Sequence, residues 1–514
     1  MRGKDIVMKA KNIFVAMLLA VSLVLGLVGC QKEAVSTDTD VVDETVEESV
    51  ADSETDQETE TEQAETTEEV QEEETVVSGP KQVIVYFANW NLDGKAAEEG
   101  GEVASIPWDS VTMINHAFWA TAPADGSTET SFERRSNGEA PRTEFKVVST
   151  NAKMDYEDTN PSAVDPSMQR NHFAEYAAYS EKYPDVNIMI SIGGWTACGY
   201  FSEMAYTPEG RTSFVKSCVD LIEQYPWIDG IDIDWEHPGG SNDGERLPES
   251  DTDQGCPIWG TPKEDTENFA ALVKELRETL DETYGAGEKM VTACASASTG
   301  WTLPNQDWVA AEPYLDFINI MTYDLAGDWD GITGHAASIT GVKGAMNYFM
   351  MKGIDTTKIN IGSPMYGTGF MMNEQMYTGK PVGAVITTPS GIDKDKLTED
   401  TIRNLEAEAV SGYEITYDAQ GIPTIGEEWD NSQDGEVCGW HFAYDSKSEG
   451  AYMYNDDADS ENYMWYISYE NPLSLQAKLD VIEKYNLAGI IVWESSEDTA
   501  DHQMIRQMGD FLLK

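Results

Sequence analysis

Eight short apolar runs, separated by longer and partly helical stretches, constrain the fold of this chain more than any other feature. Several runs are apolar almost throughout, which is typical of parallel strands that helices cover on the outside. The runs are QVIVYFA (82–88), VTMINHAF (111–118), VNIMISI (186–192), IDGIDIDW (228–235), KMVTACAS (289–296), LDFINIMTY (315–323), KINIGSPMY (358–366) and LAGIIVWE (487–494). Helical patterns lie between them, for example TENFAALVKELRETLDETY (266–284). This alternation predicts an α/β fold, a (β/α)8 TIM barrel, in which chemistry belongs at the C-terminal ends of the strands.

One connection is too long for a simple barrel. About 120 residues, rich in Tyr and Gly, separate the seventh run from the eighth. Because a structureless loop of that length is improbable in a compact domain, we expect a small α+β insertion between strands 7 and 8, at residues 370–465. The barrel would then consist of residues 80–369 and 466–514. The loops 119–165 and 237–265 should build the barrel mouth together with this insertion.

The first thirty residues indicate an export signal rather than part of the fold. Basic residues precede an apolar run at 13–28, and LVGC follows, ending at Cys30. The apolar run is shorter than a comfortable membrane span, and LVGC resembles the lipobox of bacterial lipoproteins, in which the cysteine is lipidated. We therefore expect a lipoprotein signal peptide at 1–30 and a lipid anchor on the extracellular face of the bacterial cell membrane, with release left open. Ordinary signal cleavage and an uncleaved anchor are the alternatives.

A strongly acidic segment follows this signal. Residues 31–79 contain 19 Asp or Glu against one Lys, and no aromatic residue. Such a segment cannot bury enough apolar surface to order itself, so we expect a disordered linker, with an acidic binding tail as the alternative. The whole chain has a net charge of −60, of which −45 falls on residues 80–514. This charge repels phosphate groups and excludes nucleic acid as a partner, whereas a neutral or cationic ligand suits it.

Five further cysteines are widely spaced and include no CxxC pair. They are Cys198, Cys218, Cys256, Cys294 and Cys438. An odd number with this spacing predicts neither a disulfide framework nor a zinc site. We interpret them as small buried hydrophobic residues, with one optional disulfide bond, and expect neither a metal nor a cofactor.

The run DGIDIDWEHP (229–238) carries four carboxylates in a segment that otherwise resembles a buried strand. Side chains alternate along a strand, so acids two residues apart share one face. The acids on this face are Asp232, Asp234 and Glu236. The intervening apolar side chains, such as Trp235, would face the outer helices. Asp229 has the opposite parity, which favours a structural part for it.

Crowding of these acids predicts an unusual proton affinity. Neighbouring acids in the row would lie roughly 6 to 7 Å apart, and in a partly dehydrated barrel at least one pKa should be raised. Glu236, nearest the mouth, is the expected proton donor, and coupling to Asp234 should help to keep it protonated near neutral pH. The alternative of a calcium cage is weaker, because calcium prefers adjacent loop oxygens to a row directed into a barrel.

These residues carry a resemblance to a known family. DGIDIDWE matches the DxxDxDxE motif of glycoside hydrolase family 18, the chitinase family, at Asp229, Asp232, Asp234 and Glu236. Four other motifs resemble those of the family in the right order: SIGGW (191–195), MTYD (321–324), SPMYGTGF (363–370) and GIIVWE (489–494). The similarity spans about residues 82–512. The insertion resembles that of processive and deep-groove bacterial chitinases and is lacking in the endo-β-N-acetylglucosaminidases of the family.

The resemblance implies a retaining, substrate-assisted hydrolysis of β-1,4 bonds between N-acetylglucosamine units. Glu236 would protonate the glycosidic oxygen while the N-acetyl carbonyl attacks C1 and forms an oxazolinium ion. Asp234 would turn toward the acetamido N–H, and Asp232 would share a proton with it. Tyr323 would donate its hydroxyl to the acetamido oxygen.

The resemblance also implies a set of substrate-binding residues. Asp324 would hold a sugar hydroxyl or the distorted ring, Trp493 would form the apolar floor at the cleavage point, and Trp195 would be a platform beyond it. Further candidates for substrate contact are Tyr366, Tyr86, Trp90 and Trp329. The residues expected to shape the end of the third strand are Ser191, Gly193 and Gly194.

Two departures from the family pattern bear on sugar positioning and chain-length preference rather than on the acid. Thr368 stands where many relatives carry Arg, and Met365 replaces the usual aromatic residue. The expected partner is chitin or a chitooligosaccharide, bound by a monomer that reaches the membrane through its lipid anchor. The alternatives are an endo-β-N-acetylglucosaminidase acting on N-glycans and a non-catalytic chitin-binding or sugar-binding lipoprotein. Inactive relatives typically lose the acid, whereas Glu236 is present.

Overall fold

The computed structural model describes most of the chain after the predicted linker. The described residues are 80–90, 103–157, 171–240, 256–300, 302–387, 440–460, 462–499 and 501–514, with two short strands at 415–417 and 423–425. The predicted signal peptide, its Cys30, the acidic linker and Cys438 lie outside these residues. Across the described part, no helix combines the length and the apolar character needed to span a bilayer.

Eight parallel strands close into a barrel, which confirms the predicted fold class. They are β1 (Gln82–Ala88), β2 (Met113–Pro123), β4 (Asn187–Gly193), β5 (Gly230–Asp234), β6 (Met290–Ser296), β7 (Phe317–Met321), β8 (Ile359–Pro364) and β15 (Gly489–Trp493). Each strand pairs with the next around the ring, and β1 closes it by pairing with both β2 and β15. Each of the eight strands lies on one of the predicted apolar runs.

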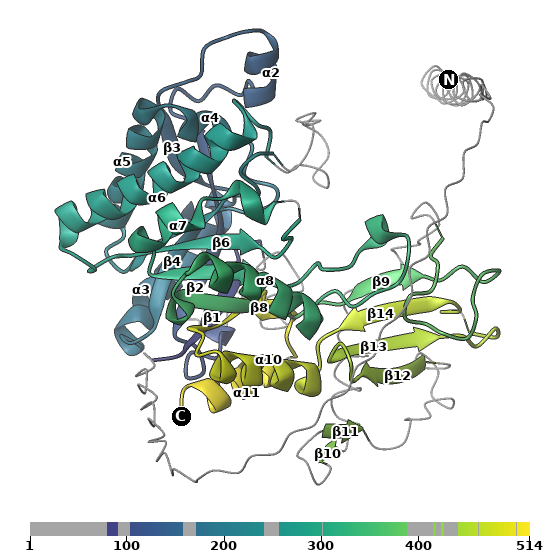
Figure 1. Ribbon diagram of the computed structural model, residues 1–514. Helices are drawn as coiled ribbons and strands as arrows, with labels where there is room; N and C mark the ends of the chain where they lie inside the picture. The colour runs from purple at the N-terminus through teal and green to yellow at the C-terminus, as the bar shows by residue number, and fades with distance from the viewer. Residues whose placement is uncertain are drawn as a thin grey trace, which may run out of the picture. The chain divides into compact units, whose positions relative to one another are not determined.

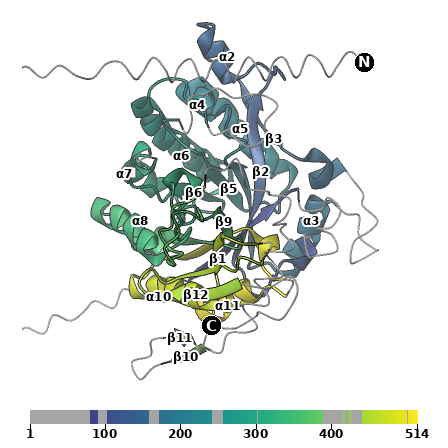
Figure 2. The same ribbon diagram turned by 90° about the vertical axis from the view of Figure 1, so that its right-hand side faces the viewer.

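Helices surround the barrel strands (Figure 1 and Figure 2). The longer ones are α3 (His172–Lys182), α5 (Pro208–Gln224), α6 (Pro262–Tyr284), α8 (Ile339–Lys352), α10 (Pro472–Lys484) and α11 (Gln503–Leu512). The shorter ones are α2 (Ser131–Ser136), α4 (Phe201–Tyr206) and α7 (Trp308–Ala311). Helix α6 begins with a capping box between Thr261 and Glu264 and has Pro262 in its first turn, which explains why this helix starts where it does.

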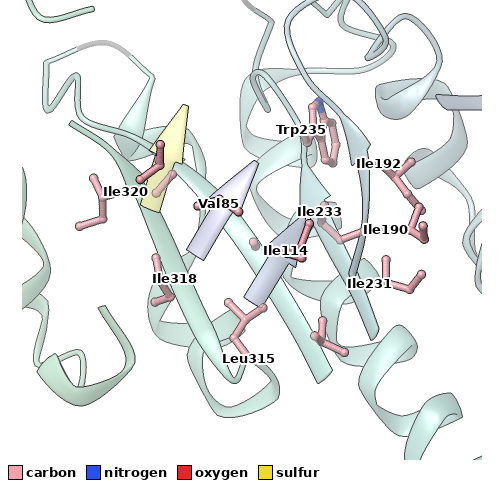
Figure 3. Packing of buried hydrophobic residues seen from close by; sticks show 14 of the residues in the cluster. Val85, Ile114, Ile190, Ile192, Ile231, Ile233, Trp235, Leu315, Ile318 and Ile320 are labelled. Atoms are coloured by element: carbon pink, nitrogen blue, oxygen red, sulfur yellow. The ribbon is translucent and has the colours of Figure 1, made fainter. Parts of the chain in front are cut away.

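The barrel strands pack their side chains in two separate layers. On the outside, Ile231, Ile233 and Trp235 of β5 pack with Ile190 and Ile192 of β4 in the large core that includes the helices (Figure 3). On the inside, a smaller cluster contains residues of opposite parity, such as Ile84 and Met113. This arrangement confirms the predicted division of β5 into an apolar outer face and an inner face that carries the acids.

Strand β2 continues beyond its predicted end and pairs with a strand that the sequence analysis did not predict. Strand β3 (Phe145–Ser149) runs antiparallel to residues 119–123 of β2. Part of the predicted loop 119–165 is therefore a two-stranded extension of the barrel sheet. The prediction missed β3 because its five residues, FKVVS, lie in a polar stretch and alternate only briefly.

A four-stranded antiparallel sheet occupies the long connection between β8 and β15. Its order is β12 (Trp440–Asp445), β13 (Gly450–Asn455), β14 (Trp465–Tyr469) and β9 (Thr368–Met371). Of these four strands, β9 comes first in the sequence and β14 comes last. They extend slightly beyond the expected limits of the insertion, 370 and 465. Strands β10 (Ile415–Tyr417) and β11 (Pro423–Ile425) form a separate pair. The described residues of the expected insertion include no helix.

This four-stranded sheet is joined to the connection that follows β7. The backbone N–H of Ala336 donates to Ser468 Oγ at 2.9 Å, and the N–H of Ile339 donates to the carbonyl of Ser448 at 2.9 Å. A β-bridge also links Ile332 to Val385. The sheet therefore lies beside the connection from β7 to α8, whose first residues belong to the candidate site.

Candidate active site

The three acids on the inner face of β5 differ in their contact with solvent. Asp232 and Asp234 are buried, whereas the side chain of Glu236 is 14% exposed. Glu236 lies two residues beyond the end of β5 and therefore stands at the C-terminal end of the strand, where the barrel opens. As predicted, it is the member of the row nearest to solvent.

Asp232 lies in a cage of hydrogen-bond donors from four neighbouring strands. Its Oδ2 accepts from Ser191 Oγ at 2.8 Å and from Tyr86 Oη at 3.0 Å. Its Oδ1 accepts from the hydroxyl of Thr292 and from Asn319 Nδ2, the latter at 3.3 Å. Burial raises the pKa of Asp232, and these donors counteract the shift by stabilising the carboxylate. Asp232 is therefore the acid of the row best equipped to carry a negative charge.

Asp234 lies in a much poorer environment for a charge. Its Oδ1 is buried and has no hydrogen-bond partner among the described residues. Burial, and then the neighbouring acids Glu236 and Asp232, raise the pKa of Asp234 well above its ordinary value. Asp234 therefore takes up a proton more readily than an ordinary carboxyl group.

Glu236 keeps its proton at neutral pH. Burial raises the pKa of Glu236 to about 8, the charge of Asp324 adds to this shift, and the backbone N–H of Trp195 opposes it. The predicted coupling between Glu236 and Asp234 is present as well, because the charge of Glu236 raises the pKa of Asp234; the sequence did not indicate the effect of Asp324. The neighbouring His237 has a pKa lowered by burial to about 4, so it is neutral beside Glu236.

The backbone at the end of β5 is held by a thiol and two glycines. Cys198 Sγ donates to the carbonyl of Asp234 at 3.1 Å and accepts from the N–H of Glu236 at 3.2 Å. The N–H of Gly194 donates to the same carbonyl at 2.8 Å. At Gly193, with φ of 123°, a Cβ would lie 1.9 Å from that oxygen, so glycine is required. These residues position the acid through its backbone.

Two residues that follow β7 meet a tyrosine from the end of β8. Tyr366 Oη donates to Asp324 Oδ1 at 2.7 Å, and Asp324 has a left-handed backbone, with φ of 51°. The ring of Tyr323 lies 6.3 Å from that of Tyr366. Burial, followed by nearby thiol and carboxyl groups, raises the pKa of Tyr323 well above its ordinary value, so its hydroxyl remains a donor. The structure thus brings together the three predicted residues of this side of the site.

Aromatic rings from β15, β1, β2 and the residues after β1 form a continuous wall. Trp493 stacks on Phe118, with ring centroids 5.2 Å apart and an interplanar angle of 15°. Its ring also lies 5.8 Å from Tyr86 and 6.3 Å from Trp90. Trp90 is 48% exposed, while Tyr86 is buried, with its hydroxyl on Asp232 rather than at the mouth. Trp493 therefore has the packing support that a sugar-stacking floor requires.

The remaining two predicted tryptophans lie in different places. Trp195 is 37% exposed, and its ring lies 6.3 Å from that of His237, next to Glu236. Trp329 is 70% exposed and lies in the turn Asp328–Asp330, with its ring against Gly327. The structure thus places Trp195 beside the acid and Trp329 on a separate turn after β7.

A buried group of two histidines and an aspartate lies behind the aromatic wall. His116 Nε2 and His172 Nδ1 lie 2.9 and 3.1 Å from Asp155 Oδ1. Asp155 Oδ2 accepts from Ser149 Oγ at 2.5 Å and from Asn89 Nδ2 at 3.3 Å. These are residue types that bind metals and they lie within 4.8 Å of one another, but donors already fill both carboxylate oxygens. The group is best described as a hydrogen-bonded charge network.

This network connects to the wall through the residues at the ends of β1 and β2. Asn89 Nδ2 donates both to Asp155 and to the carbonyl of Phe118, the latter at 3.1 Å. Burial alone would raise the pKa of Asp155, but the two imidazoles hold it below its ordinary value. The ionised Asp155 therefore holds the side chain of Asn89 in place. Asn89 in turn holds the backbone at Phe118 and precedes Trp90 in the chain.

Several other predicted residues have structural surroundings. Asp229 lies at the start of β5, where its Oδ2 accepts from the N–H of Ile188 at 2.9 Å, far along the strand from Glu236. Met365 is buried in the outer core, and Thr368 pairs with Ser468 within the four-stranded sheet. The four described cysteines are free thiols, so no disulfide bond joins any two of them.

Sequence reasoning missed the polar partners that the neighbouring strands supply. Thr292 and Cys294 of β6 and Asn319 of β7 all face the inner acids, and Cys198 holds the backbone behind them. The alternation of side chains along the strand could have revealed them, because Thr292 and Cys294 share one face of KMVTACAS and Ala293 lies on the other. Classing the cysteines as hydrophobic residues hid this signal.

Comparisons with known proteins agree with this geometry. The family model described as glycosyl hydrolases family 18 matches residues 82–498. Chitinase A of Pseudoalteromonas piscicida is 27% identical over 453 residues, which cover 81% of this chain and 50% of that protein. Chitinase C of Streptomyces lividans is 25% identical over 447 residues, which cover 82% of this chain and 58% of that protein. The chain thus spans about half the length of these curated relatives.

Solved structures share the fold. Chitinase ChiA74 from Bacillus thuringiensis has a TM-score of 0.60 at 22% identity, covering 85% of this chain and 70% of that one. A family 18 N-acetylglucosaminidase from Paenibacillus barengoltzii has a TM-score of 0.55 at 21% identity, covering 84% of this chain and all of that one, 100%. Because the family model matches most of the chain, this protein belongs to the glycosyl hydrolases family 18.

Proposed function

We propose that this protein is a chitinase that hydrolyses β-1,4 bonds between N-acetylglucosamine units of chitin or chitooligosaccharides, with retention of configuration. One observation carries the proposal, namely the position of Glu236 at the mouth above the buried acids Asp234 and Asp232, where burial raises the pKa of Glu236 to about 8. The curated relatives named chitinases support the choice of substrate. The four-stranded sheet beside the mouth supports a long polymer groove rather than a compact N-glycan site.

Glu236 acts as the general acid. Its pKa of about 8 keeps it protonated at pH 7 yet still able to release the proton during bond cleavage. The proton passes to the glycosidic oxygen while the substrate's own acetamido oxygen attacks C1 and closes an oxazolinium ring. The nucleophile is part of the substrate, so the contribution of the protein is chiefly orientation, which is worth effective molarities of about 10⁵ to 10⁸ M.

Asp234 stabilises the positive charge that develops on this ring. In the resting site Asp234 holds a proton next to Asp232. Its buried Oδ1 has no hydrogen-bond partner among the described residues, so no hydrogen bond to that atom has to break when the side chain turns. When Asp234 turns toward the acetamido N–H, it leaves its proton on Asp232 and becomes negatively charged. The donor cage around Asp232 then supports the protonated carboxyl through the same hydroxyl groups, which accept as well as donate.

The walls of the site orient the reacting sugar. Tyr323 donates its hydroxyl to the acetamido oxygen, and Asp324, held by Tyr366, binds a sugar hydroxyl. Trp493 stacks under the ring. Exposed Trp90 and Trp195 extend the groove on either side of the cleavage point, and Trp329 forms a more distant part of it.

We also infer how the chain is organised and where it acts. The LVGC sequence and the apolar run before it support a signal peptide at 1–30 with lipidation of Cys30. The acidic composition of 31–79 supports a linker that holds the catalytic part away from the extracellular face of the cell membrane. The long connection supports an insertion domain at 370–465 between the two barrel segments. The catalytic part acts as a monomer.

The direct test is the substitution Glu236→Gln. It removes the transferable proton and keeps the size of the side chain, so turnover of chitohexaose should fall by about 10² to 10⁴-fold or more, while binding of the oligosaccharide is retained. The matched control is Glu278→Gln, at an exposed position of α6, which should keep full activity. Unchanged turnover in Glu236→Gln would sink the proposal, and cleavage of a high-mannose glycoprotein in preference to chitohexaose would favour the endo-β-N-acetylglucosaminidase alternative.

A further inference from the structure

Two polar side chains of β14 join the four-stranded sheet to the connection that follows β7. They are Tyr466 and Ser468, which lie two residues apart and therefore share one face of the strand, and both are buried. Tyr466 Oη lies 3.4 Å from His335 Nδ1. Ser468 Oγ accepts a hydrogen bond from the backbone N–H of Ala336 at 2.9 Å. One face of β14 thus holds two consecutive residues of the connection.

The side chain of His335 is enclosed by the same sheet. Its Nε2 lies 3.1 Å from Asp445 Oδ2 on β12, and its ring lies 5.6 Å from that of Tyr452 on β13. A Cβ on Gly450, at the start of β13, would lie 2.8 Å from His335 Nδ1, so the ring packs directly on the backbone of that strand. Burial lowers the pKa of His335, although Asp445 opposes the shift, so the ring is neutral at pH 7. The anchor therefore keeps the same charge at every pH above neutrality.

The anchored end of the connection is bonded to the residue that follows Asp324. The backbone N–H of Leu325 donates to the carbonyl of Ala336 at 2.8 Å. Asp324 itself has a left-handed backbone, with φ of 51°, which is uncommon for a residue with a side chain and persists where the surrounding structure holds it. Tyr366 holds the carboxylate of Asp324 at 2.7 Å. The backbone next to Asp324 is held by two hydrogen bonds in series, from Leu325 to Ala336 and from Ala336 to Ser468.

We propose that Ser468 is a positioning residue, through which the four-stranded sheet holds the connection after β7 and keeps the carboxylate of Asp324 in place in the site. This inference rests on the proposed function, in which Asp324 binds a sugar hydroxyl. Ser468 acts at a distance, because two backbone hydrogen bonds separate its hydroxyl from the peptide that follows Asp324. The sheet thus supports the reaction centre itself, in addition to the groove.

A double-mutant cycle tests whether Ser468 acts through Asp324. Ser468→Ala removes the acceptor of the Ala336 N–H, and kcat/KM on chitohexaose should fall by roughly 3- to 10-fold. Asp324→Gly removes the carboxylate, and glycine adopts a positive φ without strain. With no side chain left at position 324 to be misplaced, adding Ser468→Ala should change kcat/KM by less than about 2-fold. The matched control is Ser446→Ala, an exposed serine in the turn between β12 and β13, which should keep the wild-type kcat/KM.

The pH profile provides a second measurement, which a loss of stability alone would not change. After burial, the charge of Asp324 is a cause of the raised pKa of Glu236, so a displaced Asp324 should move the alkaline limb of kcat/KM to lower pH. We expect a shift of roughly 0.3 unit or more in Ser468→Ala, and none beyond that of Asp324→Gly in the double variant. The other titratable groups beside Glu236 in the described part of the chain are Asp234, His237, Tyr323, Cys198 and Cys294. None of them belongs to the anchored end of the connection or to the four-stranded sheet.

Either of two outcomes would overturn the inference. One is an equal loss of kcat/KM from Ser468→Ala with and without the carboxylate at position 324, and the other is an alkaline limb that Ser468→Ala leaves in place. If Ser468→Ala does not fold, Asp445→Ala takes its place in both measurements, because it removes the partner of His335 at a position whose side chain is 27% exposed. Glu236→Gln, measured in parallel, separates this failure from failure of the proposed function, because only the latter leaves Glu236→Gln fully active.

Discussion

At the scale of single residues, the charge of Asp324, after β7, affects the pKa of Glu236, after β5. Its charge is the second cause, after burial, of the raised pKa of Glu236. Wild-type activity should therefore fall as the pH rises through about 8, where Glu236 loses the proton that it donates in the proposed mechanism. A neutral amide at position 324 would remove the repulsion and lower the pKa of Glu236.

The substitution Asp324→Asn should move the alkaline limb of kcat/KM to lower pH by roughly 0.5 to 1 unit. A lower maximal rate should accompany the shift, because Asp324 also binds the sugar in the proposed function, but only the position of the limb reports the charge. The measurement is the pH profile on chitohexaose, with Asp220→Asn, an exposed change on α5, as control. An unshifted limb would show that burial alone raises the pKa of Glu236.

The sequence was sufficient to predict the inner row and the raised pKa of Glu236, but not the groups outside the row that act on these acids. Strict alternation along β5 places Asp232, Asp234 and Glu236 on one face, whatever the surrounding fold. The effects of Asp324 and of the thiols of Cys198 and Cys294 depend on distances between strands that are remote in the chain, so no local pattern reveals them.

At the scale of elements, a buried charge network ties the N-terminal part of the barrel together. Asp155, in the π-helical turn Lys153–Glu157, accepts hydrogen bonds from His116 on β2 and His172 on α3. These two partners lower the pKa of Asp155 below its ordinary value, although burial alone would raise it. A carboxyl group of this kind stabilises the folded protein at pH values above its pKa in the unfolded chain, which is about 4. The stabilisation is lost as the pH falls through the lower pKa that the group has in the folded protein.

The substitution Asp155→Asn should lower the free energy of unfolding at pH 7 by about 2 to 4 kcal/mol, because several hydrogen bonds to a buried charge are weakened together. Urea denaturation followed by circular dichroism measures this change. Glu157→Gln, exposed in the same turn, is the matched control and should change stability little. Equal stability of Asp155→Asn and wild type would show that the network carries no net energy.

Elements with continuous apolar runs were predictable, and the others were not. The barrel strands are largely buried on both faces, so several of their sequences are apolar almost throughout and stand out from the helices. Strand β3 and the outer strands of the four-stranded sheet have mixed composition, and their partners lie far away in the chain. Pairing between β14 and β9, for example, joins residues about a hundred positions apart.

At the scale of the whole molecule, the barrel and the sheet beside it place a proton donor, an inner acid pair and an aromatic wall at one end of eight strands. The order of motifs along the chain was enough to predict this arrangement, because a (β/α)8 barrel gathers the ends of its strands at one mouth. The net charge of −45 on residues 80–514 fits a neutral polysaccharide, which carries no charge to be repelled.

The central claim is that the substrate's own acetamido group displaces the leaving sugar, with Glu236 as the acid. The most direct measurement is proton NMR of the first products of chitohexaose hydrolysis, recorded before the anomers equilibrate. In the proposed mechanism the new reducing ends appear first as the β-anomer, because two successive inversions at C1 restore the original configuration. The α-anomer as the first product, or the absence of cleavage, would contradict it.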